Sequence, residues 1–376
     1  MLGTCLYLVS CTFILYLESS VLRVAYYYHQ SKRLAADHEG NNPYGALLCD
    51  ALERHGLEVE YSVDYSPEYL RRNQGRIDVL HWQWPHHDYY HDDAEIMQRQ
   101  MEDLLSSLEL ARELGYKVVW TAHNIYPHNR THQEIDHEFQ LHLCRLATAI
   151  IAHCEVNAEG VRREFGRSHD LFIIPHGHFI GVYPYRFSRS ECRSELGVPE
   201  SGFVYGFIGG ILPYKGIEEF ADAFCRLPEP DCWLLAAGGG PAKYVDSLWS
   251  RIGDHPRILS NFVHGDMKAS NEDLIRVLTA SDVVVLPFHA TMSSGSVVLA
   301  LSHARPVIAP ALGCLPSTLL PGGGILYDPK RKDALLEAMR EVQGWDRDAA
   351  SETALASVQR LDWDGIAKKT LEAYRA

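Results

Sequence analysis

The chain has 376 residues, of which 46% are hydrophobic and 22% are charged, so it is long enough for two globular domains with separate cores. Asp and Glu number 49 against 35 Lys and Arg, and the resulting net charge of −14 argues against a general nucleic-acid binder. Any site for an anionic ligand must therefore be built locally, from backbone N–H groups and single cations.

The nine cysteines are scattered, with no C-x-x-C pair and no spacing typical of a disulfide framework. This distribution favours a reducing compartment, and we expect a cytoplasmic protein. The cysteines are Cys5, Cys11, Cys49, Cys144, Cys154, Cys192, Cys225, Cys232 and Cys314.

An apolar segment occupies residues 2–17 and ends at Glu18. It is shorter than the about 20 residues that span a bilayer, and no basic region precedes it. The first expected strand follows almost at once, at Val21 or Leu22. Residues 1–20 are therefore either an over-extended start or loosely held tail, or a membrane anchor.

The first half of the chain alternates β-branched and aromatic runs with helical patterns. Helices are expected around residues 46–52, 94–114 and 158–165. Because parallel strands are joined by right-handed crossovers, this alternation predicts a doubly wound parallel sheet over residues 21–180. The expected strands are residues 22–28, 57–63, 78–85, 117–123, 149–153 and 171–174.

A segment rich in Pro and Gly, residues 175–184, reads as a hinge before a second α/β series over residues 181–360. A final helix over 361–376 begins at Asp362-Trp-Asp364, and Trp363 is expected to pack it back across the cleft. The fold class is thus α/β, with two Rossmann-like domains whose strand carboxyl ends face one cleft. The expected strands of the second domain are residues 203–208, 232–237, 258–263, 283–286, 306–309 and 324–326.

The stretch Phe203 to Phe224 runs from strand to loop to helix, and Gly209 and Gly210 interrupt it. In such a unit the glycines let the backbone approach a ligand, and the helix N-terminus favours a phosphate. Lys215 would add a mobile positive charge. The alternative is a plain Gly-rich turn with a solvated lysine, since short glycine motifs are common.

Three segments in order, Gly209 to Gly216, Ala280 to Phe288 and Ser293 to Pro310, resemble the donor half of GT-B nucleotide-sugar glycosyltransferases. The first half adds the strand end Trp120 to His128, and the hinge adds residues 174–177. The likeness is strongest to bacterial enzymes that build surface polysaccharides on lipid-linked acceptors. It implies a nucleotide-sugar donor as substrate and an enzyme at the inner face of the membrane.

The donor's diphosphate gains charge as the glycosidic bond breaks, so the site needs positive potential aimed at the leaving group. Ser293, Ser294, Gly295 and Ser296 open a helix and offer N–H groups and hydroxyls, while Lys215 reaches the same oxygens.

Gly239, in the run 238–240, is expected to face the nucleotide base, although a tight turn explains these glycines nearly as well. Two departures from the resemblance matter. Gly210 stands where the family usually has an arginine. Thr291 and Leu299 stand nearest to two glutamates of many retaining members, and residues 283–327 contain no acidic residue, so retention of configuration is not implied.

His123 ends a strand at the expected cleft mouth, where the resemblance places a sugar-contacting histidine, and it is the first candidate for proton acceptor. The alternative is a histidine that only holds the turn after the strand. Asp88 is the second candidate base. Its surrounding stretch, residues 82–88, equally reads as an aromatic loop that binds acceptor sugar rings.

No metal or other cofactor is expected, because the pairs His87 and His91, and His128 and His132, lack a third ligand at a recognised spacing. The pairs Asp346 and Asp348, and Asp362 and Asp364, read as helix caps. Six arginines are expected to form a basic face that docks on a membrane surface. The alternative is that they are ordinary solvated charges on helices. They are Arg71, Arg72, Arg76, Arg162, Arg163 and Arg167.

Three functions remain open from the residues. The first is transfer of a hexose from a nucleotide sugar to a lipid-linked or oligosaccharide acceptor. The second is a sugar-nucleotide 2-epimerase on the same fold, and the third is a non-catalytic GT-B scaffold.

Overall fold

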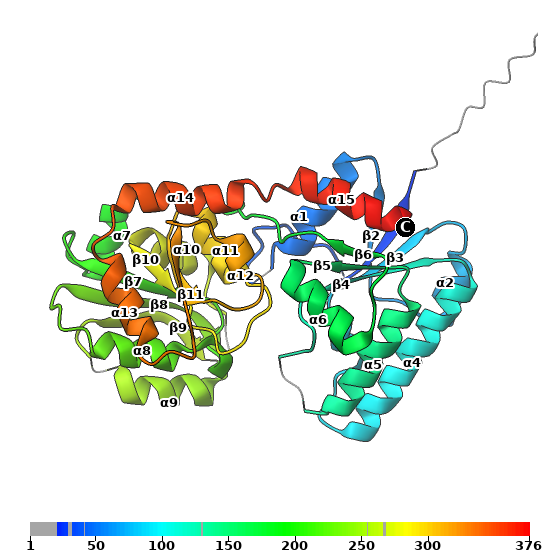
Figure 1. Cartoon of the computed structure of the whole chain (residues 1–376), viewed down its shortest axis with the longest axis horizontal. Coiled ribbons are helices and arrows are strands. Elements are labelled where there is room, and N and C mark those ends of the chain that lie inside the picture. Colours follow the sequence, from blue (N-terminus) through cyan, green and yellow to red (C-terminus); the bar gives the residue numbers. More distant parts are fainter. Residues whose placement is uncertain (1–20, 29–31, 41, 129–130, 254, 266–267) are drawn as a thin grey trace, which may run out of the picture.

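The computed structural model describes residues 21–28, 32–40, 42–128, 131–253, 255–265 and 268–376, which form two α/β domains, each built on a six-stranded parallel sheet (Figure 1). The strand orders are β2-β1-β3-β4-β5-β6 and β12-β11-β10-β7-β8-β9, and every pairing is parallel. In each sheet the strand order changes direction beside the first strand, between β1 and β3 and between β7 and β10. Ligands of such folds bind at these switch points. The two doubly wound sheets predicted from the sequence are confirmed.

The first sheet has buried strands because helices cover both faces. Helix α1 and the last helix of the chain, α15 (Trp363–Arg375), pack on one face, and α4, α5 and α6 lie on the other. The strands are β1 (Arg23–Tyr27), β2 (Glu58–Ser62), β3 (Val79–Trp82), β4 (Lys117–Ala122), β5 (Ala149–Ala152) and β6 (Leu171–Ile173). The helices are α1 (Tyr44–Arg54), α2 (Pro67–Arg72), α3 (His86–Tyr89), α4 (Ala94–Glu113), α5 (Gln133–Leu146) and α6 (Glu155–Phe165).

The second sheet has the same construction, and β7 is buried along its whole length. The strands are β7 (Phe203–Ile208), β8 (Cys232–Gly240), β9 (Ile258–Gly265), β10 (Val283–Val285), β11 (Val307–Pro310) and β12 (Gly324–Tyr327). The helices are α7 (Arg189–Leu196), the 3₁₀ turn η1 (Pro213–Lys215), α8 (Ile217–Cys225), α9 (Ala242–Ile252), α10 (Asn271–Ala280), α11 (Gly295–Ser302), α12 (Leu315–Thr318), α13 (Ala334–Val342), α14 (Arg347–Gln359) and α15 (Trp363–Arg375).

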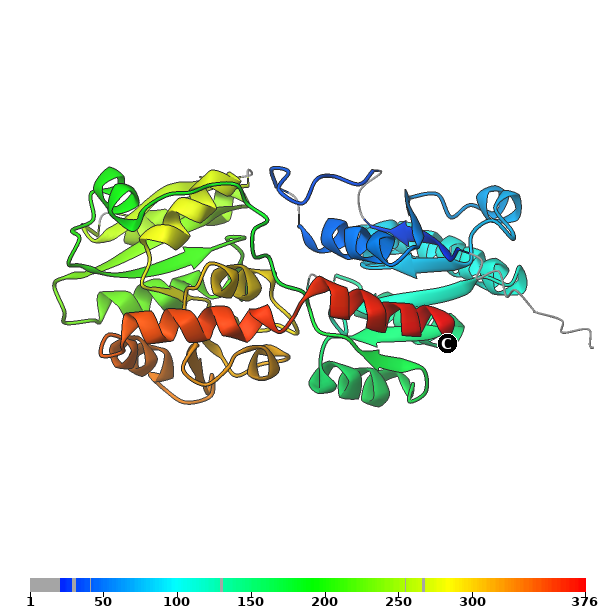
Figure 2. The same ribbon diagram turned by 90° about the horizontal axis from the view of Figure 1, so that it is seen from above.

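The last helix, α15, returns to the first domain and lies beside α1, as Figure 2 shows. Asp362 caps its first turn by accepting from the Gly365 N–H at 2.7 Å, and Asp346 caps α14 in the same way, so both expected caps are confirmed. The Trp363 indole donates to the His178 carbonyl at 2.7 Å. A Cβ at Gly177 would lie 2.4 Å from the Trp363 ring, so the ring fits because residue 177 is glycine. The predicted return across the cleft is confirmed.

Two further contacts join the domains. A disulfide links Cys154, at the start of α6, to Cys314, at the start of α12. The cysteine spacing had no disulfide pattern because these partners lie 160 residues apart in different domains. The inference of a reducing compartment loses its support with this bond.

The second contact joins the loop before α1 to the start of α10. The Glu39 carboxylate accepts from the Asn271 N–H at 2.8 Å, and the Asn271 side chain donates to the Asp37 carbonyl at 2.8 Å. Lys268 donates to the Gly40 carbonyl at 2.7 Å. Glu39, from the first domain, thus places a negative charge at the positive end of the α10 dipole. It also gives a hydrogen-bond acceptor to the Asn271 N–H at the start of that helix.

The apolar segment at residues 1–20 lies outside the described residues. Within the described part of the chain, no helix is both long and apolar enough to cross a membrane.

Candidate active site

A cleft of about 490 Å³ lies between the two domains, at the carboxyl ends of their strands. His123 lines its first-domain wall. The second-domain wall holds most of the residues expected to bind the donor. These are Gly209, Gly210, Lys215, Ser293, Ser294, Gly295 and Ser296. The structure therefore gathers residues that stand up to 173 positions apart in the sequence, from His123 to Ser296, around one space.

The loop after β7 requires glycine at its first position. Gly209 has a φ of +107°, and a Cβ there would lie 2.7 Å from the Ser296 hydroxyl. The loop and the start of α11 thus meet without a side chain between them. This close approach leaves backbone exposed to the cleft, as a phosphate site needs.

Lys215 stands at the end of η1, half-buried, with its ammonium 4.7 Å from the centre of the Phe288 ring and 5.2 Å from that of Tyr214. Burial lowers its pKa to about 8. Among the described residues it forms no ion pair. A partly desolvated cation without a carboxylate partner is suited to receive an anionic ligand.

Helix α11 supplies the second electropositive group. Ser294 is its N-cap, and its hydroxyl accepts from the Val297 N–H at 3.3 Å. The Gly295 and Ser296 N–H groups make no hydrogen bond within the described part of the chain. The helix N-terminus therefore offers two amides to an anion. From the sequence, the Ser294 hydroxyl was expected to contact the phosphates. In the structure it caps α11 instead.

Gly239 lies outside the residues that line the cleft. It continues strand β8, and its carbonyl accepts from the Ile211 N–H at 2.8 Å. Gly239 thus lies in a strand and not in the tight turn given as the alternative, and it supports the loop that follows Gly209. Gly210 and Leu299 both line the cleft, where the resemblance would have an arginine and a glutamate.

His123 is buried in a chain of hydrogen bonds. Its Nε2 lies 2.8 Å from Gln83 Oε1, and its Nδ1 lies 3.0 Å from His153 Nε2. His153 Nδ1 donates to the Ile174 carbonyl at 2.9 Å. Trp84 stacks on the imidazole with centroids 3.9 Å apart. Both ring nitrogens of His123 therefore already have protein partners.

The protonation of this chain follows from the Ile174 carbonyl, which only accepts. A neutral His153 must carry its proton on Nδ1, so its Nε2 accepts from His123 Nδ1–H. His123 Nε2 is then unprotonated, and Gln83 must turn its NH₂ group toward it. The opposite amide orientation would require a positive charge on one histidine, although burial lowers the pKa of both. In either state His123 has no free nitrogen.

Gln83 continues the chain to the last helix. Its amide lies 2.9 Å from His81 Nε2, and His81 Nδ1 lies 2.7 Å from the Tyr374 hydroxyl. Thr121 completes the surroundings of His81, with its hydroxyl 2.8 Å from Nε2. The sequence pattern did not reveal this network, because its members come from four separate strands and one distant helix.

Asp88 lies in α3 and does not line the cleft. Burial raises the pKa of its carboxyl to about 6, and the neighbouring Trp82 indole opposes that rise. Burial, and then the charges of Asp88 and Asp103, raise the pKa of Tyr65, on the loop after β2. The structure thus does not bring the two candidate bases, Asp88 and His123, together.

A side pocket of about 410 Å³ adjoins the cleft on the first-domain side. The sequence reading expected the aromatic stretch after β3 to bind sugar rings, and that stretch supplies part of this pocket. His128 stacks on Tyr214 of the second domain, with ring centroids 4.4 Å apart. The pocket is lined by Trp84, His86, His87, Tyr90, Asn124, Pro127, His128, Leu212 and Tyr214.

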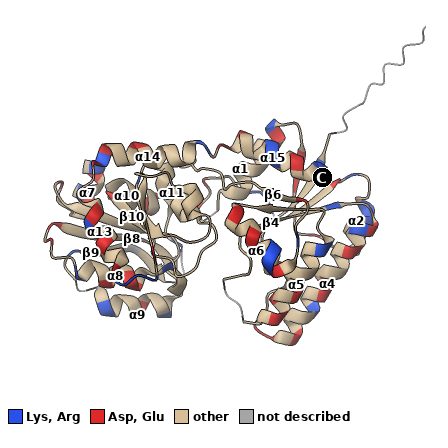
Figure 3. Ribbon diagram, in the orientation of Figure 1, with Lys and Arg blue, Asp and Glu red and all other residues tan. Residues whose placement is uncertain are grey.

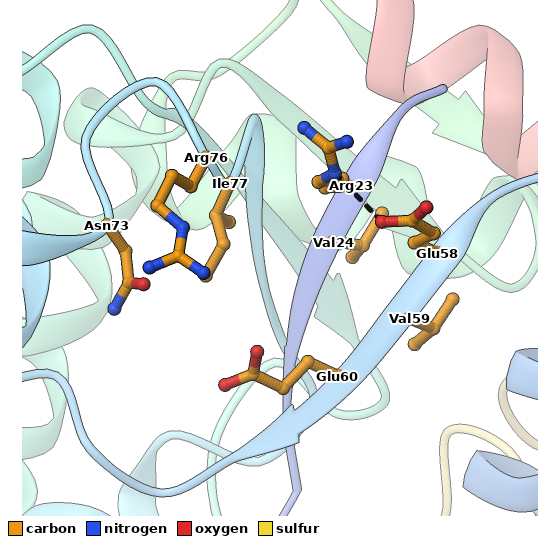
Figure 4. Close-up of a pocket in the computed structure, with 8 residues that line it drawn as sticks. All are labelled: Arg23, Val24, Glu58, Val59, Glu60, Asn73, Arg76 and Ile77. Carbon is orange, nitrogen blue, oxygen red and sulfur yellow. Dashed lines mark hydrogen bonds and ion pairs between the residues drawn. The ribbon is translucent and has the colours of Figure 1, made fainter. Parts of the chain in front are cut away.

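Another hollow, of about 510 Å³, lies at the amino ends of β1 and β2 (Figure 4). It contains an ion pair between Arg23 and Glu58 at 2.8 Å, while Glu60 accepts from the Tyr69 hydroxyl. Ligands of parallel sheets bind at the opposite, carboxyl ends of the strands. The position and the paired charges separate this hollow from the candidate active site.

The arginines expected to form a basic face differ in their surroundings. Arg167 is 8% exposed and donates to the carbonyls of Cys144, Thr148 and His169, which satisfies it inside the domain. Arg162 and Arg163 pair with glutamates on their own helix. In the ribbon of Figure 3, positions of Lys or Arg alternate with positions of Asp or Glu along the helices of the first domain.

No group of three His, Cys, Asp or Glu side chains in the described part of the chain is placed to hold a metal ion.

Comparison with known proteins agrees with this geometry. Residues 202–343, which contain the Gly209 loop, Lys215 and α11, match the family model described as "Glycosyl transferases group 1". Among solved structures, sucrose-phosphate synthase from Thermosynechococcus elongatus superposes with a TM-score of 0.71 at 18% identity, covering 94% of this chain and 98% of that one. Anabaena HepE in complex with UDP-glucose superposes with a TM-score of 0.67 at 18% identity, covering 93% and 98%.

Two curated relatives differ in how much of their length is matched. A GDP-mannose:glycolipid 4-beta-D-mannosyltransferase of Xanthomonas campestris is 28% identical over 346 residues, 89% of this chain and 88% of that protein. A D-inositol 3-phosphate glycosyltransferase of Corynebacterium urealyticum is 29% identical over 203 residues, and this match spans only 50% of the chain and 46% of that relative. Residues 202–343 thus match the group 1 glycosyltransferases, and the chain has the GT-B fold of two facing Rossmann-like domains.

Proposed function

We propose that the protein transfers a hexose from a nucleoside diphosphate sugar to a hydroxyl of a lipid-linked or oligosaccharide acceptor. One observation carries this proposal: a single cleft has a lysine and a free helix N-terminus on one wall and stacked aromatic and imidazole rings on the other. The first wall suits a diphosphate leaving group, and the second suits sugar rings.

GDP-mannose as donor and a glycolipid as acceptor are the first choice. The relative whose name states both is similar over 89% of this chain, so the likeness extends over the half that holds the side pocket. UDP-glucose is the second donor to test, because the solved HepE structure contains it. A lipid-linked acceptor would bring the enzyme to the inner face of the membrane.

The reaction is proposed to invert the anomeric configuration. A double displacement needs an enzymatic nucleophile, commonly a carboxylate, at the anomeric carbon. No Asp or Glu is among the described residues that line the cleft or the side pocket. A single displacement needs only a proton acceptor for the incoming hydroxyl. NMR of the product should therefore show the anomeric configuration opposite to that of the donor, and the same configuration would contradict this.

Calorimetry with GDP, UDP, GDP-mannose and UDP-glucose, followed by transfer assays with a polyprenyl diphosphate-linked disaccharide, tests the proposal. We expect one nucleotide to bind in the micromolar range or tighter, and nucleoside diphosphate to be released faster when acceptor is added. Interconversion of the free donor without acceptor would indicate the 2-epimerase, and nucleotide binding without turnover would indicate the scaffold. Flotation with anionic and neutral liposomes tests membrane docking, and equal binding would exclude electrostatic attraction as its cause.

A further inference from the structure

The cleft and the side pocket share one short wall. Four residues line both spaces. A donor in the cleft and an acceptor in the side pocket would therefore meet at this wall. The shared residues are Trp84, Asn124, His128 and Tyr214.

Of these four, only His128 has a side chain that exchanges a proton near neutral pH. Trp84 and Asn124 do not titrate, and burial raises the pKa of Tyr214 above its ordinary value of 10. The His128 imidazole stacks on Tyr214, and neither of its nitrogens has a hydrogen-bond partner within the described residues. This separates it from His123, whose two nitrogens are bonded to Gln83 and His153.

We propose that His128, rather than His123, accepts the proton of the acceptor hydroxyl during glycosyl transfer. This rests on the proposed function. The acceptor oxygen forms a bond to the anomeric carbon as its proton passes to an imidazole nitrogen of His128. The bond between the anomeric carbon and the diphosphate oxygen breaks, and its electron pair leaves with the nucleoside diphosphate. The proton is later lost from His128 to solvent.

The charges around His128 suit a base. The charge that acts on it is that of Lys215, and the other titratable side chains that line the side pocket with it are His86, His87, Tyr90 and Tyr214. Burial, and then the charge of Lys215, lower the pKa of His128 below 6.5, so the imidazole is neutral and able to accept at pH 7. The negative charge of a bound diphosphate would offset the positive charge of Lys215. The pKa of His128 would then rise, which makes it a stronger base when the donor is in place.

The test uses the full chain with GDP-mannose and with UDP-glucose. It measures the rate of nucleoside diphosphate release when the sugar passes to water alone and when the polyprenyl diphosphate-linked disaccharide is present. We expect His128→Gln to lower turnover about 10²-fold or more while the affinity for GDP or UDP changes less than about 2-fold. Added imidazole should restore part of the turnover of His128→Ala. His169→Gln is the matched control, because His169 is 71% exposed and lies away from the cleft.

The pH profile supplies a second measurement. The wild type should lose turnover as the pH falls through the pKa of His128, and His128→Gln should lack that inflection. Wild-type turnover in His128→Gln, or no rescue by imidazole together with weakened nucleotide binding, would overturn the proposal. A wild type that releases nucleotide from neither donor would instead overturn the proposed function itself.

Discussion

Lys215 shows how a single residue is prepared for an anionic ligand. Its ammonium lies 4.7 Å from the Phe288 ring centre, and its pKa is lowered to about 8 because burial disfavours the charged form. An anionic diphosphate beside it would favour the charged form and raise the pKa again. Binding is then coupled to proton uptake at any pH between the two pKa values.

We therefore expect nucleotide affinity to decline as the pH rises above about 8, where free Lys215 becomes neutral. Calorimetry near pH 8.5 in two buffers of different ionisation enthalpy should show proton uptake. In Lys215→Met both the uptake and most of the affinity should be lost. A Lys215→Met variant that binds GDP or UDP like the wild type would show that the phosphate site lies elsewhere.

Gln83 is a residue whose importance lies in what it satisfies. It is 1% exposed and stands between His81 and His123, at 2.9 and 2.8 Å. Replacing it with leucine keeps the volume but leaves a buried nitrogen of His123 without a partner. A lost partner of this kind costs about 1–3 kcal/mol.

We expect Gln83→Leu to lower the free energy of unfolding by that amount in urea titrations. Gln98→Leu, on the outer face of α4, should change it by less than about 0.5 kcal/mol. Equal stability of Gln83→Leu and the wild type would mean that the chain of bonds from Tyr374 to Ile174 does not stabilise the fold.

At the scale of elements, alternation and end signals were sufficient to predict both sheets and the caps at Asp346 and Asp362, since these depend on residues close in sequence. The start of α6 was placed three residues late, because Cys154 at its N-cap makes no side-chain cap. The position of Gly209, Lys215 and Ser293 to Ser296 on one wall of the cleft could be predicted from a loop and a helix start. The partners of His123 and the disulfide could not, because each joins elements that no local pattern relates.

The loop after β7 lies against the start of α11, where Gly209 approaches Ser296. Gly209→Ala would adopt φ near +107° and place its Cβ 2.7 Å from the Ser296 hydroxyl, which costs about 1–3 kcal/mol. We expect lower stability in urea and at least about tenfold weaker nucleotide binding. Gly210→Ala meets its nearest atom, on Leu212, only at 3.4 Å, and should unfold at nearly the wild-type urea concentration. If Gly209→Ala matches Gly210→Ala in stability, the loop adapts and the close approach is not required.

At the scale of the whole molecule, the two domains are joined on both sides of the cleft. Glu39 caps α10 on one side. On the other, the Cys154–Cys314 bond lies next to the segment that leads into α11, since the Cys314 N–H donates to the carbonyl of Met292, the residue before Ser293, at 2.7 Å. Trp363 and α15 hold the domains at the hinge. Opening of the cleft must therefore break the Glu39 contact, while the covalent bond limits how far the domains separate.

Reducing the Cys154–Cys314 bond should let the domains separate further. We expect small-angle scattering to give a larger radius of gyration after addition of dithiothreitol, because a covalent link between the domains is removed. Cys154→Ser should already have the larger value, and dithiothreitol should not change it. Thiol titration of the unfolded, non-reduced chain checks the premise: because Cys154 and Cys314 are paired, Cys154→Ser should expose one thiol more than the wild type. One thiol fewer in Cys154→Ser would show that the bond does not form, and an unchanged radius with one thiol more would show that the remaining contacts alone hold the cleft closed.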